Sequence, residues 1–167
     1  PPRPPRAPTD PELDALARKW TLRPEDAHLT RALLSTIRKA GDGRLDRGEL
    51  KILSAALREL RYAFKTFEPY KNLRKVSLFG SARTRPDAPE YRQALAFARG
   101  AVDAGFMVIT GAGDGIMAAG NEGAGAAKSF GLNVHLPFEQ SSNRFIAGDP
   151  KLITFRYFFT RKLVFLK

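Results

Sequence analysis

A glycine-rich stretch, Thr110 to Gly115, follows an apolar run at residues 106–110 and precedes a helical pattern. A turn between a strand and a helix presents free backbone N–H groups beside the positive end of a helix dipole, and this combination binds phosphate. Gly111, Gly113 and Gly115 lack a Cβ atom, so an anion could approach the backbone closely. The stretch predicts a phosphate-binding turn, and a tight turn without a ligand is the alternative.

Two better-known phosphate motifs do not fit this stretch. The dinucleotide fingerprint G-x-G-x-x-G needs a third glycine where Ile116 stands, and an acid about twenty positions later, where the chain has Asn133 and His135. The P-loop of nucleoside triphosphatases places Gly-Lys-Ser/Thr before its helix, whereas Ile116 and Met117 follow Gly115. Both readings are therefore excluded.

A second turn, Gly80-Ser81, follows an apolar run at residues 76–79. In open α/β folds, ligands bind where neighbouring parallel strands end, at the carboxyl edge of the sheet. The Ser81 hydroxyl could therefore bond a phosphate or ribose oxygen. A serine that caps the turn is an equally good explanation.

The segment from residue 71 onward alternates apolar runs with helical patterns. Continuous apolar strands between helices indicate a parallel sheet covered on both faces, so we expect an α/β, Rossmann-like domain over residues 71–167. The expected strands are 76–79, 106–110, 132–136 and a short fourth at 151–155, and the expected helices are 91–104, 116–130 and 157–166.

The preceding residues predict a helical extension over 11–70. Apolar residues recur at helical spacing, with breaks at Pro24 and at 41–43, and Pro69 ends the last helix. Asp46 and Glu49 have the spacing of a capping box at the start of that helix. Residues 1–10 are rich in proline and arginine and lack the apolar stretch of a signal peptide, so we expect a disordered leader.

Composition narrows the range of functions. The chain has no cysteine, which excludes a disulfide scaffold and thiolate metal sites and fits a reducing cytoplasm. No apolar run reaches the ~20 residues of a membrane span, so we expect no membrane partner. The net charge of +11 lies outside the nearly neutral stretch 76–150. Because basic residues do not alternate with aromatic ones along a stripe, we expect no nucleic-acid partner, although a nucleic-acid module remains a third hypothesis.

Three stretches together resemble the LOG family, the nucleoside 5′-monophosphate phosphoribohydrolases long mislabelled as lysine decarboxylases. They are Val76–Ser81, Val108–Met117 and Phe159–Lys162, and the similarity covers roughly residues 71–167. The resemblance implies a Rossmann-like fold and a homodimer. It also implies hydrolysis of the N-glycosidic bond of AMP or a cytokinin riboside monophosphate to free base and ribose 5-phosphate, without a metal or other cofactor.

The same resemblance assigns the site residues. Arg161 matches the catalytic arginine of the family. The expected substrate- and phosphate-binding residues are Gly80, Ser81, Thr110, Gly111, Gly113, Gly115, Met117 and Lys162. The family's second loop, P-G-G-x-G-T-x-x-E, carries its catalytic glutamate and follows the Arg-Lys pair, but no such loop occurs up to Lys167.

We therefore expect an incomplete sheet in this stretch, and an enzyme that cannot hydrolyse a nucleotide with residues 1–167 alone. The alternative function is a non-catalytic nucleotide or molybdenum-cofactor carrier, because related Rossmann-like binding proteins share the glycine turn.

Overall fold

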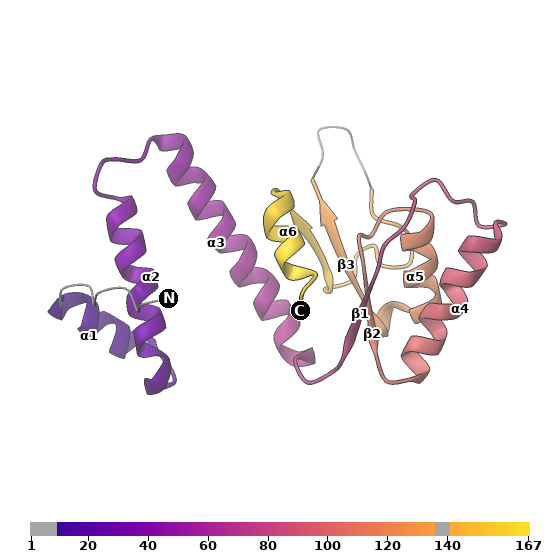
Figure 1. The fold of residues 1–167 in the computed structure, drawn as a ribbon, viewed down its shortest axis with the longest axis horizontal. Helices are drawn as coiled ribbons and strands as arrows, with labels where there is room; N and C mark the ends of the chain where they lie inside the picture. Colours follow the sequence, from indigo (N-terminus) through magenta and orange to yellow (C-terminus); the bar gives the residue numbers. More distant parts are fainter. Residues whose placement is uncertain (1–9, 136–140) are drawn as a thin grey trace, which may run out of the picture. The chain divides into compact units, whose positions relative to one another are not determined.

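A computed structural model describes residues 10–135 and 141–167 (Figure 1). Most of the predicted leader, and the end of the strand expected at 132–136, lie outside the described residues. Contacts within the chain divide it into two compact units, one ending at Ser54 and one beginning at Ala55. In the part of the chain that the structure describes, no helix has the length and apolarity needed to cross a membrane.

The first unit contains α1 (Pro11–Trp20), a 3₁₀ turn (η1, Pro24–Asp26), α2 (Ala27–Ala40) and the start of α3 (Arg47–Phe67). Asp10 caps α1, because its carboxylate accepts hydrogen bonds from the backbone N–H groups of Glu12 and Leu13 at 3.1 and 3.3 Å. Ion pairs from Arg31 to Asp14 and from Arg38 to Asp10 tie α1 to α2.

The predicted capping box at the start of α3 is confirmed. The Asp46 N–H donates to the Glu49 carboxylate and the Glu49 N–H donates to the Asp46 carboxylate, each at 2.8 Å. Each side chain thus satisfies a backbone donor that a helix N-terminus leaves free. The helix ends at Phe67, before Pro69, and a 3₁₀ turn follows (η2, Glu68–Tyr70).

The second unit is built on a four-stranded parallel sheet, which confirms the α/β, Rossmann-like fold. Its strands, in the spatial order β1-β2-β3-β4, are β1 (Lys75–Leu78), β2 (Met107–Thr110), β3 (Ser129–Val134) and β4 (Leu152–Phe155). Three helices follow strands along the chain: α4 (Pro89–Asp103), α5 (Ile116–Ala124) and α6 (Phe158–Val164). Because all strands are parallel, their carboxyl ends meet at one edge, with the loops after β1 and β2 side by side.

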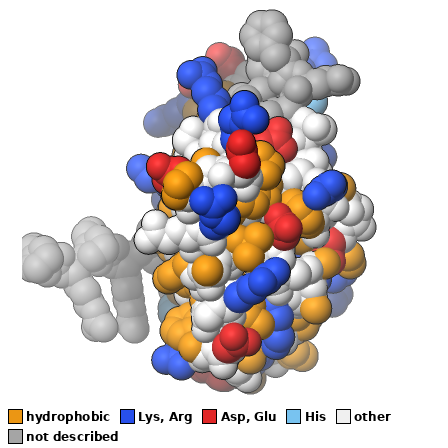
Figure 2. Space-filling model, turned by 90° about the vertical axis from the view of Figure 1, so that its right-hand side faces the viewer, with side chains coloured by type: hydrophobic (Ala, Val, Ile, Leu, Met, Phe, Trp, Pro, Cys, Tyr) orange, Lys and Arg blue, Asp and Glu red, His pale blue; other side chains and the backbone are white. Residues whose placement is uncertain are grey.

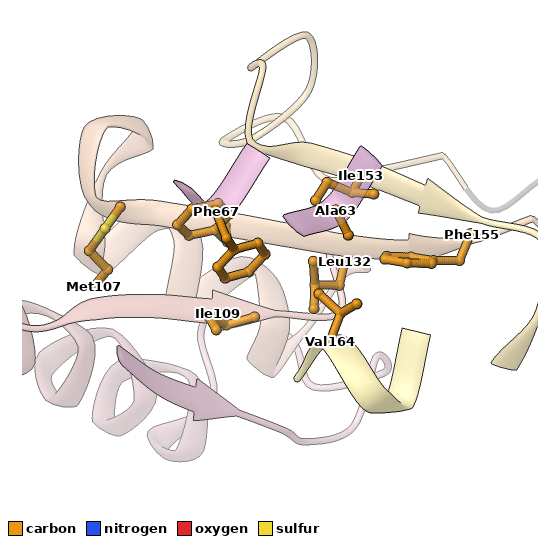
Figure 3. Packing of buried hydrophobic residues seen from close by; sticks show 9 residues of the cluster. Ala63, Phe67, Met107, Ile109, Leu132, Ile153, Phe155 and Val164 are labelled. Atoms are coloured by element: carbon orange, nitrogen blue, oxygen red, sulfur yellow. The ribbon is translucent and has the colours of Figure 1, made fainter. Parts of the chain in front are cut away.

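Helices cover both faces of this sheet, as predicted. The last turns of α3 pack with α6 on one face, and α4 and α5 lie on the other (Figure 1). The cluster on the α3 face consists of Ala63, Phe67, Met107, Ile109, Phe130, Leu132, Ile153, Phe155 and Val164 (Figure 3). The Phe67 and Phe130 rings stack with centroids 4.0 Å apart. Burying each large apolar side chain contributes about 1.5–3 kcal/mol.

The helix predicted over residues 116–130 begins at Ile116 as expected, but its predicted end at Phe130 was wrong. The helix α5 ends at Ala124, Gly125 takes a left-handed φ of 71°, and β3 begins at Ser129. Phe130 is fully buried and pairs with Ile109 of β2. The gain from placing Phe130 in the sheet core outweighs the local helical spacing, which tertiary packing often overrides.

Candidate functional site

The glycine turn lies between β2 and α5, at the carboxyl edge of the sheet, and most of its backbone is buried. Ala112 and Gly115 both have left-handed φ values, 62° and 61°. Among the described residues, Ala112 is the one non-glycine residue with a positive φ. Such a conformation costs of order 1–3 kcal/mol and persists only where the surroundings enforce it.

A buried polar network enforces the shape of the turn. The Thr110 hydroxyl donates to the Asn121 amide oxygen at 2.7 Å and accepts from the Ala112 N–H at 3.0 Å. The Asn143 side-chain amide donates to the Gly113 carbonyl at 2.9 Å and to the same Asn121 oxygen at 3.0 Å. The Thr110 hydroxyl, a predicted ligand contact, is thus engaged in holding the turn.

The two predicted turns lie against each other. The Ile116 N–H donates to the Ser81 carbonyl at 3.0 Å, and a Cβ on Gly115 would come within 2.2 Å of that same oxygen. A Cβ on Gly80 would lie 2.5 Å from Ile116. The Ser81 hydroxyl accepts from the Arg83 N–H at 3.1 Å, as in a capping turn. Gly80 and Gly115 are therefore needed for loop packing, whatever ligand approaches.

Arg161 reaches the glycine turn from α6. Its Nε donates to the Leu132 carbonyl at 2.6 Å and its Nη2 to the Gly111 carbonyl at 3.3 Å. A Cβ on Gly111 would lie 2.5 Å from that Nη2 and 2.7 Å from the Met117 sulfur. Gly111, Met117 and Arg161 are therefore brought together, although Arg161 follows Gly111 by 50 residues.

Electrostatics at Arg161 favour an anionic ligand. The side chain is half-buried, and this burial lowers the pKa of its guanidinium from the ordinary value. Arginine nevertheless stays protonated in proteins. No carboxylate of the described residues lies within ion-pair distance of it, and its Nη1 group has no hydrogen-bond partner there. A fixed positive charge with unused donors thus faces the turn.

Glu59 of α3, which the sequence did not single out, holds α6 in place. Its carboxylate accepts from the Arg156 N–H at 2.7 Å and from the buried Thr160 hydroxyl at 2.5 Å. The Ser77 hydroxyl of β1 donates to the Phe165 carbonyl just beyond α6 at 3.2 Å. These contacts fix the helix that carries Arg161. Since they join residues 88 to 101 positions apart, no local pattern could predict them.

Lys162 is exposed. It lines an apolar groove of about 750 Å³ together with Arg161. The groove's other residues are Ser77, Phe79, Phe158, Phe159, Phe165 and Leu166.

A pocket on the other side of the turn was not predicted either. It has a volume of about 620 Å³ and lies between the loop after β1, the start of α5 and residues 141–145. At this side the Tyr91 hydroxyl donates to Glu122 at 2.6 Å. Burial, followed by this hydrogen bond, raises the pKa of Tyr91 to about 12. Figure 2 looks onto the side of the molecule on which α4 lies in Figure 1 and shows basic side chains at its upper end, beside acidic ones.

No protein-family model matches the chain, and the search of curated proteins found no match. The described residues also contain no cluster of three or more His, Asp or Glu side chains able to hold a metal ion.

Proposed function

We propose that this chain supplies the nucleotide-binding part of a phosphoribohydrolase. In this proposal, the substrate is a nucleoside 5′-monophosphate such as AMP or a cytokinin riboside monophosphate, and the products are the free base and ribose 5-phosphate. The contact between Arg161 and Gly111 carries the proposal. The candidate catalytic arginine and the candidate phosphate turn, far apart in the sequence, share one edge of the sheet. A homodimer, which rests on the resemblance, and a cytoplasmic location, which the absence of cysteine fits, complete the proposal.

The proposed reaction requires support for positive charge on the sugar. As the bond to the base lengthens, the ribose becomes oxocarbenium-like, and a carboxylate stabilises it or activates water. Arg161 would hold the anionic substrate with its Nη1 donors, because a guanidinium presents forked donors that suit a phosphate.

The described residues place no carboxylate beside Arg161. Glu122 is bonded to Tyr91, and Asp114 lines the pocket on the other side of the turn. We therefore expect residues 1–167 to bind AMP without releasing adenine above background, because a missing acid–base group typically lowers rates ~10²–10⁴-fold. The same observation favours the second candidate, a non-catalytic nucleotide or molybdenum-cofactor carrier.

Titration calorimetry with AMP tests the proposed site. Arg161→Ala should weaken AMP binding at least ~10-fold, as expected for a lost charge-assisted hydrogen bond. Arg99→Ala, on the exposed side of α4, is the matched control and should leave the affinity unchanged. A folded Arg161→Ala protein with wild-type affinity would refute the site.

An assay of free adenine tests the proposed division of roles. Residues 1–167 should release none, whereas a longer form of the protein with a carboxylate beside Arg161 should release it. Adenine release by residues 1–167 would show that a carboxylate within them acts. A longer form that binds AMP and leaves it intact would support the carrier.

A further inference from the structure

The excess positive charge of the second unit comes from two segments that are far apart in the sequence. Residues 55–75 and 151–167 each contain more Lys and Arg than Asp and Glu, whereas the stretch between them is nearly neutral. The fold brings these segments together, because α3 and α6 cover the same face of the sheet (Figure 1). On the side where α4 lies, basic side chains lie beside acidic ones (Figure 2). The two sides of this unit therefore differ in charge.

Three exposed cations form a row along the second half of α3, and we call them the α3 row. Arg58, Arg61 and Lys65 have the i, i+3 and i+7 spacing of one helix face, and all three are exposed. Ala63 and Phe67, on the opposite side of the helix, are buried in the core. At 1.5 Å per residue the row spans about 10 Å, enough to meet more than one phosphate of a strand.

Two further cations reach this part of α3 from the segment 151–167. The Arg156 N–H donates to the Glu59 carboxylate at 2.7 Å, and the Lys167 Nζ lies 4.6 Å from the centre of the Phe64 ring. The Arg156 and Lys167 side chains are exposed. Among the described residues, neither they nor the α3 row have a carboxylate at ion-pair distance. Glu59, the acid nearest in the helix, is bonded to α6 instead.

An exposed aromatic ring accompanies these cations. Tyr62 follows Arg61 directly and Arg58 by four positions, and its side chain is 51% exposed. Sites for single-stranded nucleic acid combine cations that follow the phosphates with aromatic rings that stack on bases. In linear order the cations are divided between two segments, so the sequence predicted no nucleic-acid partner. The fold places them around one half of one helix.

An anionic lipid surface is the other polyanion that a basic helix can meet, but α3 suits it less well. A helix that lies on a membrane buries a broad apolar face in the lipid. In the second half of α3, all of which the structure describes, Leu57 is the one exposed aliphatic side chain. The exposed Phe64 ring already has the Lys167 ammonium over it. Cations and a tyrosine are the main exposed groups, and these favour a nucleic acid.

We propose that this surface of α3 binds a single-stranded nucleic acid. The α3 row contacts phosphates, Tyr62 stacks on a base, and Arg156 and Lys167 add contacts to the backbone of the strand. The surface contains none of the residues of the two glycine turns and does not include Arg161. The proposal is therefore independent of the proposed hydrolysis.

Fluorescence anisotropy with labelled oligo-U and oligo-dT, measured over a series of KCl concentrations, tests the phosphate contacts. Arg61→Gln together with Lys65→Gln should weaken binding and make the slope of log K against log salt less steep by about 1.4, since each contact to a single strand contributes ~0.7. Glutamine has nearly the helix propensity of Arg and Lys, so α3 should persist, which circular dichroism checks. Arg99→Gln together with Lys128→Gln removes the same charge from exposed positions elsewhere and should leave the slope unchanged.

Tyr62→Ala tests the contact to a base. It should weaken strand binding at least ~5-fold, the lower end for one lost stacking contact, and leave the salt slope unchanged. Polyphosphate, which has no bases, should bind wild type and Tyr62→Ala equally, and Tyr62→Phe should retain strand binding. The oligo-U and oligo-dT arms distinguish an RNA from a DNA ligand, and binding of either supports the proposal.

Four outcomes would overturn it. They are no strand binding by wild type at low salt, a wild-type slope in the folded Arg61→Gln and Lys65→Gln variant, equal weakening of strand and polyphosphate binding by Tyr62→Ala, and tighter binding to a duplex or to phosphatidylserine vesicles than to the single strand. The last result with vesicles would assign the surface to a membrane.

Discussion

At the scale of single residues, two glycines of the turn between β2 and α5 approach different groups. A Cβ on Gly111 would meet the flexible ends of Arg161 and Met117, whereas one on Gly115 would meet the Ser81 backbone. The sequence predicted these glycines from their possible approach to a phosphate. It could not predict their approach to Arg161 and Ser81, because that depends on how separate loops pack.

We therefore expect opposite outcomes for two glycine substitutions. Gly111→Ala should displace Arg161 and weaken AMP binding with little change in the free energy of unfolding. Gly115→Ala adds a Cβ at a φ of 61° and 2.2 Å from a carbonyl oxygen, so it should destabilise the fold by about 2–4 kcal/mol. Urea unfolding and calorimetry separate the two effects. Equal loss of stability in both variants would contradict this account.

Tyr91 gives a prediction about pH. Its folded pKa of about 12 lies above the ordinary value of 10.0, so the fold favours the neutral phenol. The resulting stability should be fully present below pH 10 and should be lost as pH rises toward 12. In an absorbance titration of the four tyrosines, one should ionise late, and Tyr91→Phe should remove that late step. A late step that survives in Tyr91→Phe belongs to another tyrosine.

At the scale of elements, the sequence predicted helices and strands well where residues close together in the chain determine them. The capping box of Asp46 and Glu49 and the apolar run of β2 are examples. The boundary between α5 and β3 was missed because burial of Phe130 in the sheet decides it. The support of α6 by Glu59 was missed because its partners lie about a hundred residues further along the chain.

Glu59 should contribute more to stability and to AMP binding than its neighbours in the sequence suggest. Glu59→Ala removes the acceptor for the Arg156 N–H and one acceptor for the buried Thr160 hydroxyl, so it should cost about 1–3 kcal/mol of unfolding free energy. It should also weaken AMP binding through Arg161, and Glu59→Gln should restore part of both. Glu68→Ala removes only an exposed pair with Lys71 and should change stability by less than about 1 kcal/mol. Denaturant titration of the three variants measures these differences.

At the scale of the whole molecule, the parallel α/β fold was predicted from alternating patterns, but its order β1-β2-β3-β4 was not. Among the described residues, β1 pairs only with β2, so its other edge has free backbone groups. Several large apolar side chains are more than half exposed here. Phe79 follows β1, Phe158 and Phe159 lie on α6, and Leu166 comes just after α6. Such an edge with apolar neighbours favours association.

We expect residues 1–167 to self-associate as their concentration rises. Sedimentation velocity over a concentration series measures the association. Phe79→Arg together with Phe158→Arg should shift the sample toward monomer. Both phenylalanine side chains are exposed, and their replacement by arginine makes the edge less apolar. Leu22→Arg is the control, since Leu22 is exposed in the other unit and should not affect association through this edge. A wild-type sample that stays monomeric throughout would contradict the prediction.

The separation between Glu59 and its partners also has a consequence for the order of folding. Neighbouring strands β1, β2 and β3 are joined through α4 and α5, so their contacts close short loops, which is fast. The contacts of α6 with Glu59 and Ser77 close loops of 88 to 101 residues, so they should form last. Glu59→Ala should then mainly speed unfolding in stopped-flow experiments and leave the refolding rate nearly unchanged. Arg161 would reach the glycine turn only in the final step, after the sheet that receives it is complete.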